Sequence, residues 1–171
     1  GADGYLTPLS GWTYSDNGVN TTSPVSGTTG YFRRAAFGSN ALMYHTYNSG
    51  TDADTVFYGP IDLPALTGGY HYEIDTEEYM NYDYAFVNMT YAGFAVSIDG
   101  GVSYNPIGQT SNYVSGTYST NYDLTGYGGQ SVHLAIIYNG TNGVNWGVST
   151  IEVREKEDPV IPVFAHSKLV F

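Results

Sequence analysis

Residues 132–153 read VHLAIIYNGTNGVNWGVSTIEV, and this stretch decides the fold class. Its first part, Val132–Tyr138, is a near-continuous apolar run, as expected for a β-strand that is covered on both sides. Asn139-Gly140 and Asn142-Gly143 then supply the positive φ angles that tight turns require. The stretch therefore predicts a strand, a turn and a second strand.

The second strand shows period-two alternation, as do shorter segments before it. Between Val148 and Val153 every second residue shares a face, so Val148 is predicted to lie beside Thr150 and Glu152. Phe94–Ile98 alternates in the same way. Strand and turn formers such as Tyr, Thr, Val and Gly dominate the chain, while helix formers are scarce. The sequence predicts an all-β fold, an antiparallel β-sandwich (jelly roll) with an extended C-terminal strand.

The chain has 171 residues, no Cys and a formal net charge of −11. This length suits one domain, and the lack of Cys excludes disulfides, thiolate metal sites and thiol catalysis. No Lys or Arg occurs between Ala35 and Val153, so binding to nucleic acid or to an anionic membrane surface is not expected. No apolar run is long enough to predict membrane insertion. The acidic middle favours calcium or neutral polyhydroxyl ligands. An extracellular or cell-surface location is expected from the three sequons described below.

Four motifs occur in one order along most of the chain, and together they carry a resemblance to a known family. They are Gly59–Leu63 (GPIDL), Ser97–Tyr104 (SIDGGVSY), Tyr122–Leu134 (YDLTGYGGQSVHL) and Asn145–Val148 (NWGV). Residues 11–153 resemble the secreted jelly-roll domains called choice-of-anchor J and MAM-like, which also occur as accessory domains of bacterial secreted proteins. The resemblance implies a secreted, non-catalytic jelly roll.

The family closes with paired Asp residues after its Trp, and these often help to bind calcium. Here Ser149-Thr150 stands in their place, so these calcium-binding acids have no counterpart. The octet around Asp99 also fits the Asp-box hairpin, in which the Asp carboxylate bonds backbone amides across the turn. We therefore predict a structural role for Asp99.

Carboxylates elsewhere in the chain are candidate ligands for a structural calcium ion, which prefers six to eight oxygens. Asp52 and Asp54 belong to a segment predicted as a loop, and a second cluster follows near the next turn. The predicted ligands are Asp52, Asp54, Asp75, Glu77 and Glu78. Calcium is the only cofactor that the sequence suggests.

The last part of the chain differs in composition from the rest. We assign residues 1–10 to an N-terminal extension, 11–153 to the sandwich, and 154–171 to a charged linker plus an extended C-terminal strand. Pro159 and Pro162 exclude the linker from a central strand. Beyond them, alternate residues form one mostly apolar face that could be donated to a neighbouring subunit. These donor-strand residues are Val163, Ala165, Ser167, Leu169 and Phe171; residues 1–9 are a second, shorter candidate.

Surface chemistry gives two further predictions. Three Asn-X-Thr sequons at Asn20, Asn88 and Asn139 fit a secreted glycoprotein. Eighteen Tyr residues invite a carbohydrate-stacking interpretation, although in a sandwich many of these rings would fill the core edge. The candidates for stacking are Tyr79, Tyr82, Tyr84, Tyr113 and Tyr118.

Two functional hypotheses from different classes follow, and neither is enzymatic, because no catalytic motif is present. The first is a structural subunit of an extracellular filament or surface layer, which polymerises head-to-tail by donating a terminal strand to the next copy. The alternative is a carbohydrate-binding or adhesion module of a secreted protein, with a polysaccharide as its partner.

Overall fold

The computed structural model describes residues 12–16, 19–21, 32–37, 40–45, 51–81, 89–111, 115–141 and 145–159. Within these ranges the chain forms eleven β-strands and no helix, so the predicted all-β fold class is confirmed. The strands are β1 Trp12–Asp16, β2 Val19–Thr21, β3 Phe32–Phe37, β4 Asn40–His45, β5 Thr51–Asp62, β6 Tyr70–Asn81, β7 Met89–Ser97, β8 Asn105–Gln109, β9 Gly116–Asp123, β10 Ser131–Thr141 and β11 Asn145–Glu157. None of the described residues belongs to a helix of the length and apolarity needed to cross a membrane.

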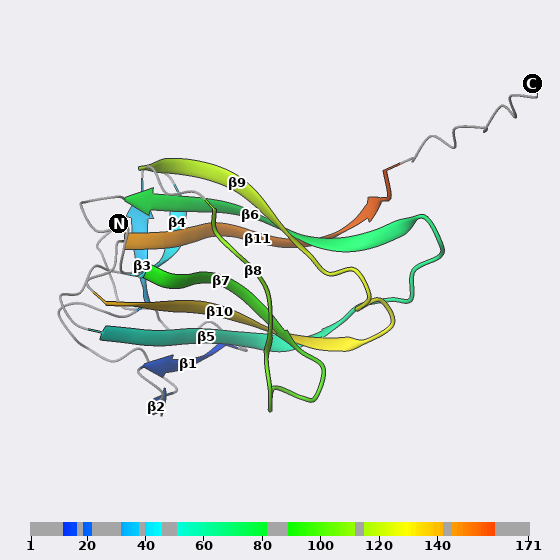
Figure 1. Cartoon of the computed structure of the whole chain (residues 1–171), viewed down its shortest axis with the longest axis horizontal. Coiled ribbons are helices and arrows are strands. Elements are labelled where there is room, and N and C mark those ends of the chain that lie inside the picture. The colour runs from blue at the N-terminus through cyan, green and yellow to red at the C-terminus, as the bar shows by residue number, and fades with distance from the viewer. Residues whose placement is uncertain are drawn as a thin grey trace, which may run out of the picture.

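The strands form two antiparallel layers (Figure 1). One sheet has six strands in the order β2-β1-β5-β10-β7-β8, and the other has five in the order β3-β4-β11-β6-β9. The apolar run at Val132–Tyr138 lies in β10, which is central because β5 and β7 pair with it on either side. On the face away from the core, Ala135 is fully buried and Ile137 is half-buried, so the strand is largely covered on both faces, as its apolar sequence predicts.

The core lies between the layers and follows from strict alternation. On β6 the even-numbered residues from Tyr72 to Met80 are buried and the odd-numbered residues are half-buried on the outer face. Phe94 of β7 meets Tyr122 of β9 across the core, with ring centroids 4.6 Å apart. Each fully buried large side chain of this kind stabilises the fold by about 1.5–3 kcal/mol relative to exposure.

A β-bulge in β11 corrects one predicted facing. The register with β6 shifts between Val148 and Thr150, so that Val148 lies opposite Glu78 and Thr150 lies opposite Glu77. Val148 is consequently buried, whereas the strict alternation of the sequence placed it beside the exposed Thr150. The extra residue at the bulge reverses the facing of everything before it.

The sandwich also extends further than the sequence predicted. β11 pairs with β6 as far as Glu157 opposite Tyr70, so residues 154–157 are part of the sheet and not a linker. The alternating charges of this stretch suit a strand whose odd and even residues face different surroundings. Backbone pairing, and not apolar content, keeps this end in the sheet.

The Asp99 hairpin has the structural role that the sequence predicted. The backbone amides of Val102 and Ser103 each donate to Asp99 Oδ1 at 3.0 Å, and the Ser103 hydroxyl donates to Oδ2 at 2.5 Å. These bonds hold the pKa of the Asp99 carboxyl well below its ordinary value. Because β7 ends at Ser97 to form this hairpin, Ile98 is 55% exposed and does not continue the buried face of Phe94.

Candidate functional site

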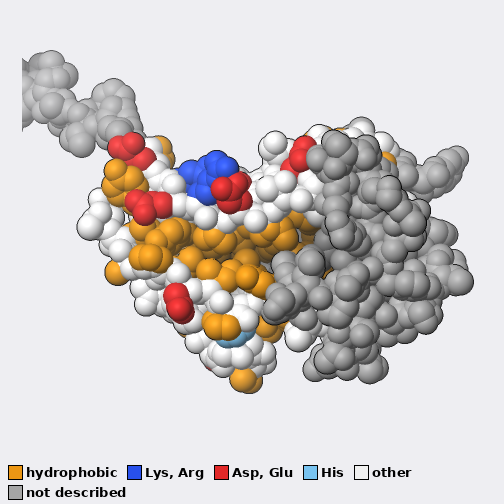
Figure 2. Space-filling view, turned by 180° about the vertical axis from the view of Figure 1, so that it is seen from behind, with side chains coloured by type: hydrophobic (Ala, Val, Ile, Leu, Met, Phe, Trp, Pro, Cys, Tyr) orange, Lys and Arg blue, Asp and Glu red, His pale blue; other side chains and the backbone are white. Residues whose placement is uncertain are grey.

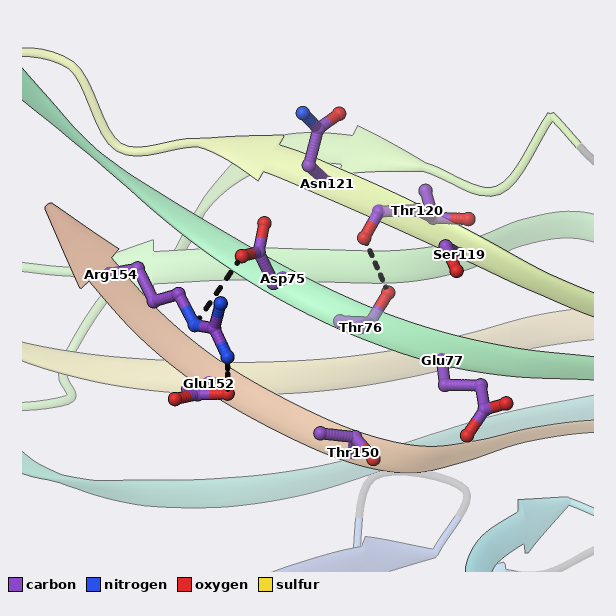
Figure 3. A pocket seen from close by; sticks show the side chains of 9 residues that line it. All are labelled: Asp75, Thr76, Glu77, Ser119, Thr120, Asn121, Thr150, Glu152 and Arg154. Atoms are coloured by element: carbon purple, nitrogen blue, oxygen red, sulfur yellow. Dashed lines mark hydrogen bonds and ion pairs between the residues drawn. The ribbon is translucent and has the colours of Figure 1, made fainter. Parts of the chain in front are cut away.

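The outer face of the five-stranded sheet carries a polar groove over β9, β6 and β11. Asp75 of β6 lies in register with Asn121 of β9 and with Glu152 of β11, so all three side chains point to the same side of the sheet. The groove has a volume of about 490 Å³ (Figure 3). It is lined by Asp75, Thr76, Glu77, Ser119, Thr120, Asn121, Thr150, Glu152 and Arg154.

Ion pairs position the charged groups at one end of the groove. Arg154 Nη2 lies 2.5 Å from Glu152 Oε2, and its Nε lies 3.6 Å from Asp75 Oδ2. Lys156 Nζ approaches the same Asp75 oxygen at 2.8 Å. The hydrogen bond from Arg154 lowers the pKa of Glu152, so this carboxylate is ionised at neutral pH and accepts hydrogen bonds.

The other end of the groove is held by uncharged donors. The Ser149 hydroxyl, at the bulge, donates to Glu77 Oε2 at 2.9 Å. At the charged end, Asn121 Nδ2 donates to Glu73 Oε2 at 3.2 Å. The lining therefore offers hydroxyl, amide, carboxylate and guanidinium groups, and none of the nine lining residues is aromatic. Such a surface can exchange many hydrogen bonds with a hydroxylated ligand.

The structure separates the five predicted calcium ligands. Asp75 and Glu77 lie in the groove, whereas Glu78 lies on the inner face of β6 and is only 2% exposed. Asp52 and Asp54 lie on β5 in the other sheet and are 2% and 1% exposed. Within the described ranges no three His, Asp or Glu side chains form a group that could hold a metal ion. Calcium binding stays a prediction, and these five residues do not form one site.

Glu78 is instead the centre of a buried hydrogen-bond cluster. Its carboxylate accepts hydrogen bonds from the Tyr122 hydroxyl, from Trp146 Nε1 at 3.2 Å and from the Thr76 hydroxyl at 3.2 Å. Burial, together with the charge of Glu78, raises the pKa of Tyr122, so the phenol stays protonated and donates. A buried carboxylate with several donors of this kind serves stability rather than ligand binding.

The remaining predicted site residues are divided by the structure. Tyr79 points to the outer face, opposite Thr117 and Gly147, while Tyr118 packs against the core. Asn139 lies half-buried in the central strand β10, and Asn20 lies in β2. Outside the described residues lie Tyr82, Tyr84, Tyr113, Asn88 and the predicted donor strand, Val163, Ala165, Ser167, Leu169 and Phe171.

Several groove residues escaped the sequence analysis, among them Ser119, Asn121 and Arg154. The signal for the first two was present, because in 117–123 small polar residues alternate with Tyr118, Thr120 and Tyr122. That alternation predicts a strand with one polar face, but it does not show which strand lies beside it. The bulge at Ser149 hid the facing of Thr150 and Arg154.

His71 joins the end of β11 to β6 and gives a pH-dependent prediction. Its Nδ1 lies 2.6 Å from Asp158 Oδ1 and its Nε2 lies 3.2 Å from Glu73 Oε1, and the two acidic partners raise the pKa of His71. We expect an NMR titration to give a midpoint above the ordinary value of about 6.5. The contribution of His71 to stability is then fully present below the unfolded pKa and is lost as the pH rises through the raised folded pKa.

Asp158→Asn removes the first of these partners and should move the His71 midpoint downward. Glu157→Gln, one residue earlier on the exposed strand end, is the matched control and should leave it nearly unchanged. A wild-type midpoint below 6.5, or equal midpoints in the two variants, would contradict the assigned contacts.

This arrangement defines the chain as an antiparallel β-sandwich domain with a polar groove on one sheet. No protein-family model matches the sequence, and no curated protein matches it. Among solved structures, the K1 cleaved adhesin domain of Lys-gingipain from Porphyromonas gingivalis W83 superposes with a TM-score of 0.52 at 13% identity, covering 89% of this chain and 94% of that one. The structure of TmCBM61 in complex with β-1,4-galactotriose gives a TM-score of 0.47 at 11% identity, covering 91% of this chain and all of that one. At 13% identity the likeness to the adhesin domain concerns the fold alone, which it supports.

Proposed function

We propose that this domain is a non-catalytic recognition module of an extracellular protein and that it binds neutral, hydroxyl-rich glycan chains in the groove over β9, β6 and β11. The observation that carries the proposal is the groove lining, nine polar residues from three adjacent strands, of which Asp75 and Glu152 are positioned by ion pairs. Thr76 and Thr120 have the core-facing parity of their strands, so the side chains of the other seven make up the outer surface. Sugar hydroxyls both donate and accept hydrogen bonds, and this lining offers partners for both. An adhesion role for the parent protein agrees with such a site.

The charge of the groove selects against anionic ligands. Three lining carboxylates, Asp75, Glu77 and Glu152, face one guanidinium, that of Arg154. The chain as a whole carries a formal net charge of −11. A polyanion such as a nucleic acid or an acidic polysaccharide would be repelled, whereas an uncharged polyhydroxyl chain would not.

The groove chemistry supports binding without catalysis. Acid–base hydrolysis of a glycoside needs one carboxyl group that stays protonated near neutral pH. In the groove, Glu152 accepts a hydrogen bond from Arg154, and this bond lowers the pKa of its carboxyl group. A general acid needs a raised pKa instead. Thr150 and Arg154 flank this carboxylate on β11, and both can hydrogen-bond a ligand.

A pair of matched Trp substitutions tests the proposal. Ser119 lines the groove, while Thr117 is exposed on the same strand two residues away and is not part of the lining. We expect neutral oligosaccharides from a panel of glucans, galactans, mannans and xylans to bind with a Kd on the order of 1 mM or tighter. Isothermal titration calorimetry should show at least a tenfold loss for Ser119→Trp and little change for Thr117→Trp.

Two results would overturn the proposal. One is the absence of binding to every neutral oligosaccharide in the panel. The other is equal binding by Ser119→Trp and the wild type, which would place any glycan site elsewhere on the domain.

A further inference from the structure

One edge of the five-stranded sheet is unpaired over much of its length. β11 pairs with β6 from Asn145 to Glu157, but β4 pairs only with Trp146–Val148 on the other side. In the part of the chain that the structure describes, no strand pairs with Thr150–Glu157 along that edge. Eight residues therefore present backbone N–H and C=O groups that a further strand could pair with.

Apolar side chains line the gap beside this edge. Ile151 and Val153 face inward and are half-buried, although their neighbours on β6 are buried, with Ile74 at 0% exposure. The other layer shows the same gradient, since Ile61 of β5 is half-buried beside the fully buried Val132 of β10. We call the half-buried residues Ile61, Leu66, Ile151 and Val153 the seam.

Figure 2 shows an apolar strip running between the two layers, with basic and acidic side chains along its upper rim. An apolar strip beside an unpaired strand edge is the combination that an added β-strand covers, because its backbone pairs with the edge while alternate side chains fill the strip. A glycan or a second sheet face would leave the backbone groups of β11 unpaired.

We propose that the seam and the unpaired edge of β11 accept residues 163–171 of a second copy of this chain as an added strand. The proposal concerns a different surface from the glycan groove and does not depend on it. A contact between the tail of one copy and the seam of the next is head-to-tail, so it propagates into chains of subunits.

The tail segment fits the acceptor in length and pattern. Twelve residues, 160–171, lie beyond the described chain. The nine residues 163–171 contain no Pro and are long enough to pair with the eight-residue edge. The odd-numbered residues of this segment form its apolar face, with small Ala165 and Ser167 between larger ends. If these residues enter the seam, Lys168 falls on the outer row, where β11 carries Thr150, Glu152, Arg154 and Lys156.

Charge favours the same pairing. Lys168 is the only Lys, Arg, Asp or Glu in residues 160–171, so the remainder of the chain carries a formal net charge of −12 (−11 minus +1). A tail with one positive charge can approach an acidic sandwich, whereas two sandwiches repel each other.

The segment that connects β11 to residues 163–171 favours pairing with β11 of a second copy over pairing with β11 of the same chain. Asp158 is held beside the start of β6, because its backbone amide donates to the Gly69 carbonyl at 2.8 Å and its carboxylate contacts His71. Pro159 and Pro162 then fix two φ angles and bias Asp158 and Ile161 toward extended conformations. Such a segment acts as a spacer of about 3.1 Å per residue rather than a reversal.

Sedimentation of the 171-residue chain at rising concentration tests the proposal. We expect the wild type to form species larger than dimers, and Leu169→Asp, which buries a charge in the seam, to reduce the assembled fraction at least tenfold. Val170→Asp is the matched control, because its side chain falls on the opposite face of the added strand and assembly should be retained. Both positions lie beyond the described strands, so neither change removes a side chain of the described core.

Mixing two blocked variants separates the proposal from other contacts. Val153→Asp blocks the acceptor and Leu169→Asp blocks the donor, so each alone should be monomeric and an equimolar mixture should form 1:1 dimers and nothing longer. Circular dichroism checks that Val153→Asp is folded; if it is not, the two tail variants still decide. A wild-type chain that stays monomeric overturns the proposal, as does equal assembly by Leu169→Asp and Val170→Asp. A monomer whose thermal stability falls in Leu169→Asp shows the tail on its own sandwich, which also overturns it.

Discussion

Glu78→Ala is expected to lower the free energy of unfolding by about 3–5 kcal/mol. The Glu78 side chain is 2% exposed, and its carboxylate accepts hydrogen bonds from the Tyr122 hydroxyl and from Trp146 Nε1. Tyr122 and Trp146 are themselves buried, so water cannot easily replace the carboxylate as their acceptor. Two buried donors without acceptors cost about 1–3 kcal/mol each, and the vacated volume adds to the loss. Urea denaturation followed by far-UV circular dichroism, which reports on all the variants alike, would measure the change.

Glu78→Gln and Trp146→Phe serve as the controls for this prediction. The amide of Gln accepts at one oxygen only, so we expect an intermediate loss of stability. Trp146→Phe removes one of the donors, and the double variant with Glu78→Ala should lose less than the sum of the single changes. A loss below about 1 kcal/mol for Glu78→Ala, the size of one ordinary hydrogen bond, would show that the cluster does not stabilise the core.

Glu78 also shows why the sequence alone did not predict which side chains of β6 face the core. Asp75, Glu77 and Glu78 are close together in the chain, and the sequence analysis grouped them as calcium ligands. β6 continues without interruption to Asn81, so consecutive residues face opposite ways and Glu78 enters the core. The mistake arose from expecting a turn where the strand continues.

Asp52 and Asp54 show a similar error. They were predicted in a loop, whereas they lie on β5 and face inward. Two buried carboxylates two residues apart resemble no ordinary strand pattern, because charged residues are rarely buried in this way. Their burial depends on β10, where Gly140 and Tyr138 lie opposite them, and the sequence does not reveal that pairing.

The class of fold needed less information. Apolar runs, period-two alternation and Asn-Gly turns are local signals, and they were sufficient to predict an antiparallel sandwich. The groove is not local, because Asp75, Asn121 and Glu152 are brought together by the registers of three strands from distant parts of the chain. Those registers depend on how the strands pack together and not on a local pattern within one strand, and the bulge at Ser149 shifts one of them.

Gly93→Ala is expected to destabilise the domain by about 2–4 kcal/mol and to loosen β8 before the rest of the sandwich unfolds. A Cβ atom on Gly93 would lie 2.2 Å from the Gly108 carbonyl oxygen and 2.5 Å from Gln109 Cα. These are backbone atoms of the paired strand, so they cannot move aside as a flexible side chain would, and β8 must separate from β7. Denaturation and amide hydrogen exchange would measure the two effects.

The exchange readout follows from the contacts that hold β8 in place. The Thr110 amide donates to the Ala92 carbonyl at 2.7 Å, and the Tyr91 hydroxyl lies 2.8 Å from the Gly108 carbonyl. In Gly93→Ala the Thr110 amide should exchange much faster, while amides of the central strand β10 follow global unfolding. Gly68→Ala is the matched control, because nothing lies within 4 Å of its added Cβ, and its stability should change by less than about 0.5 kcal/mol. Equal stability of the two Ala variants would mean that β7 and β8 are not as close as described, and the edge of the six-stranded sheet would then end at β7.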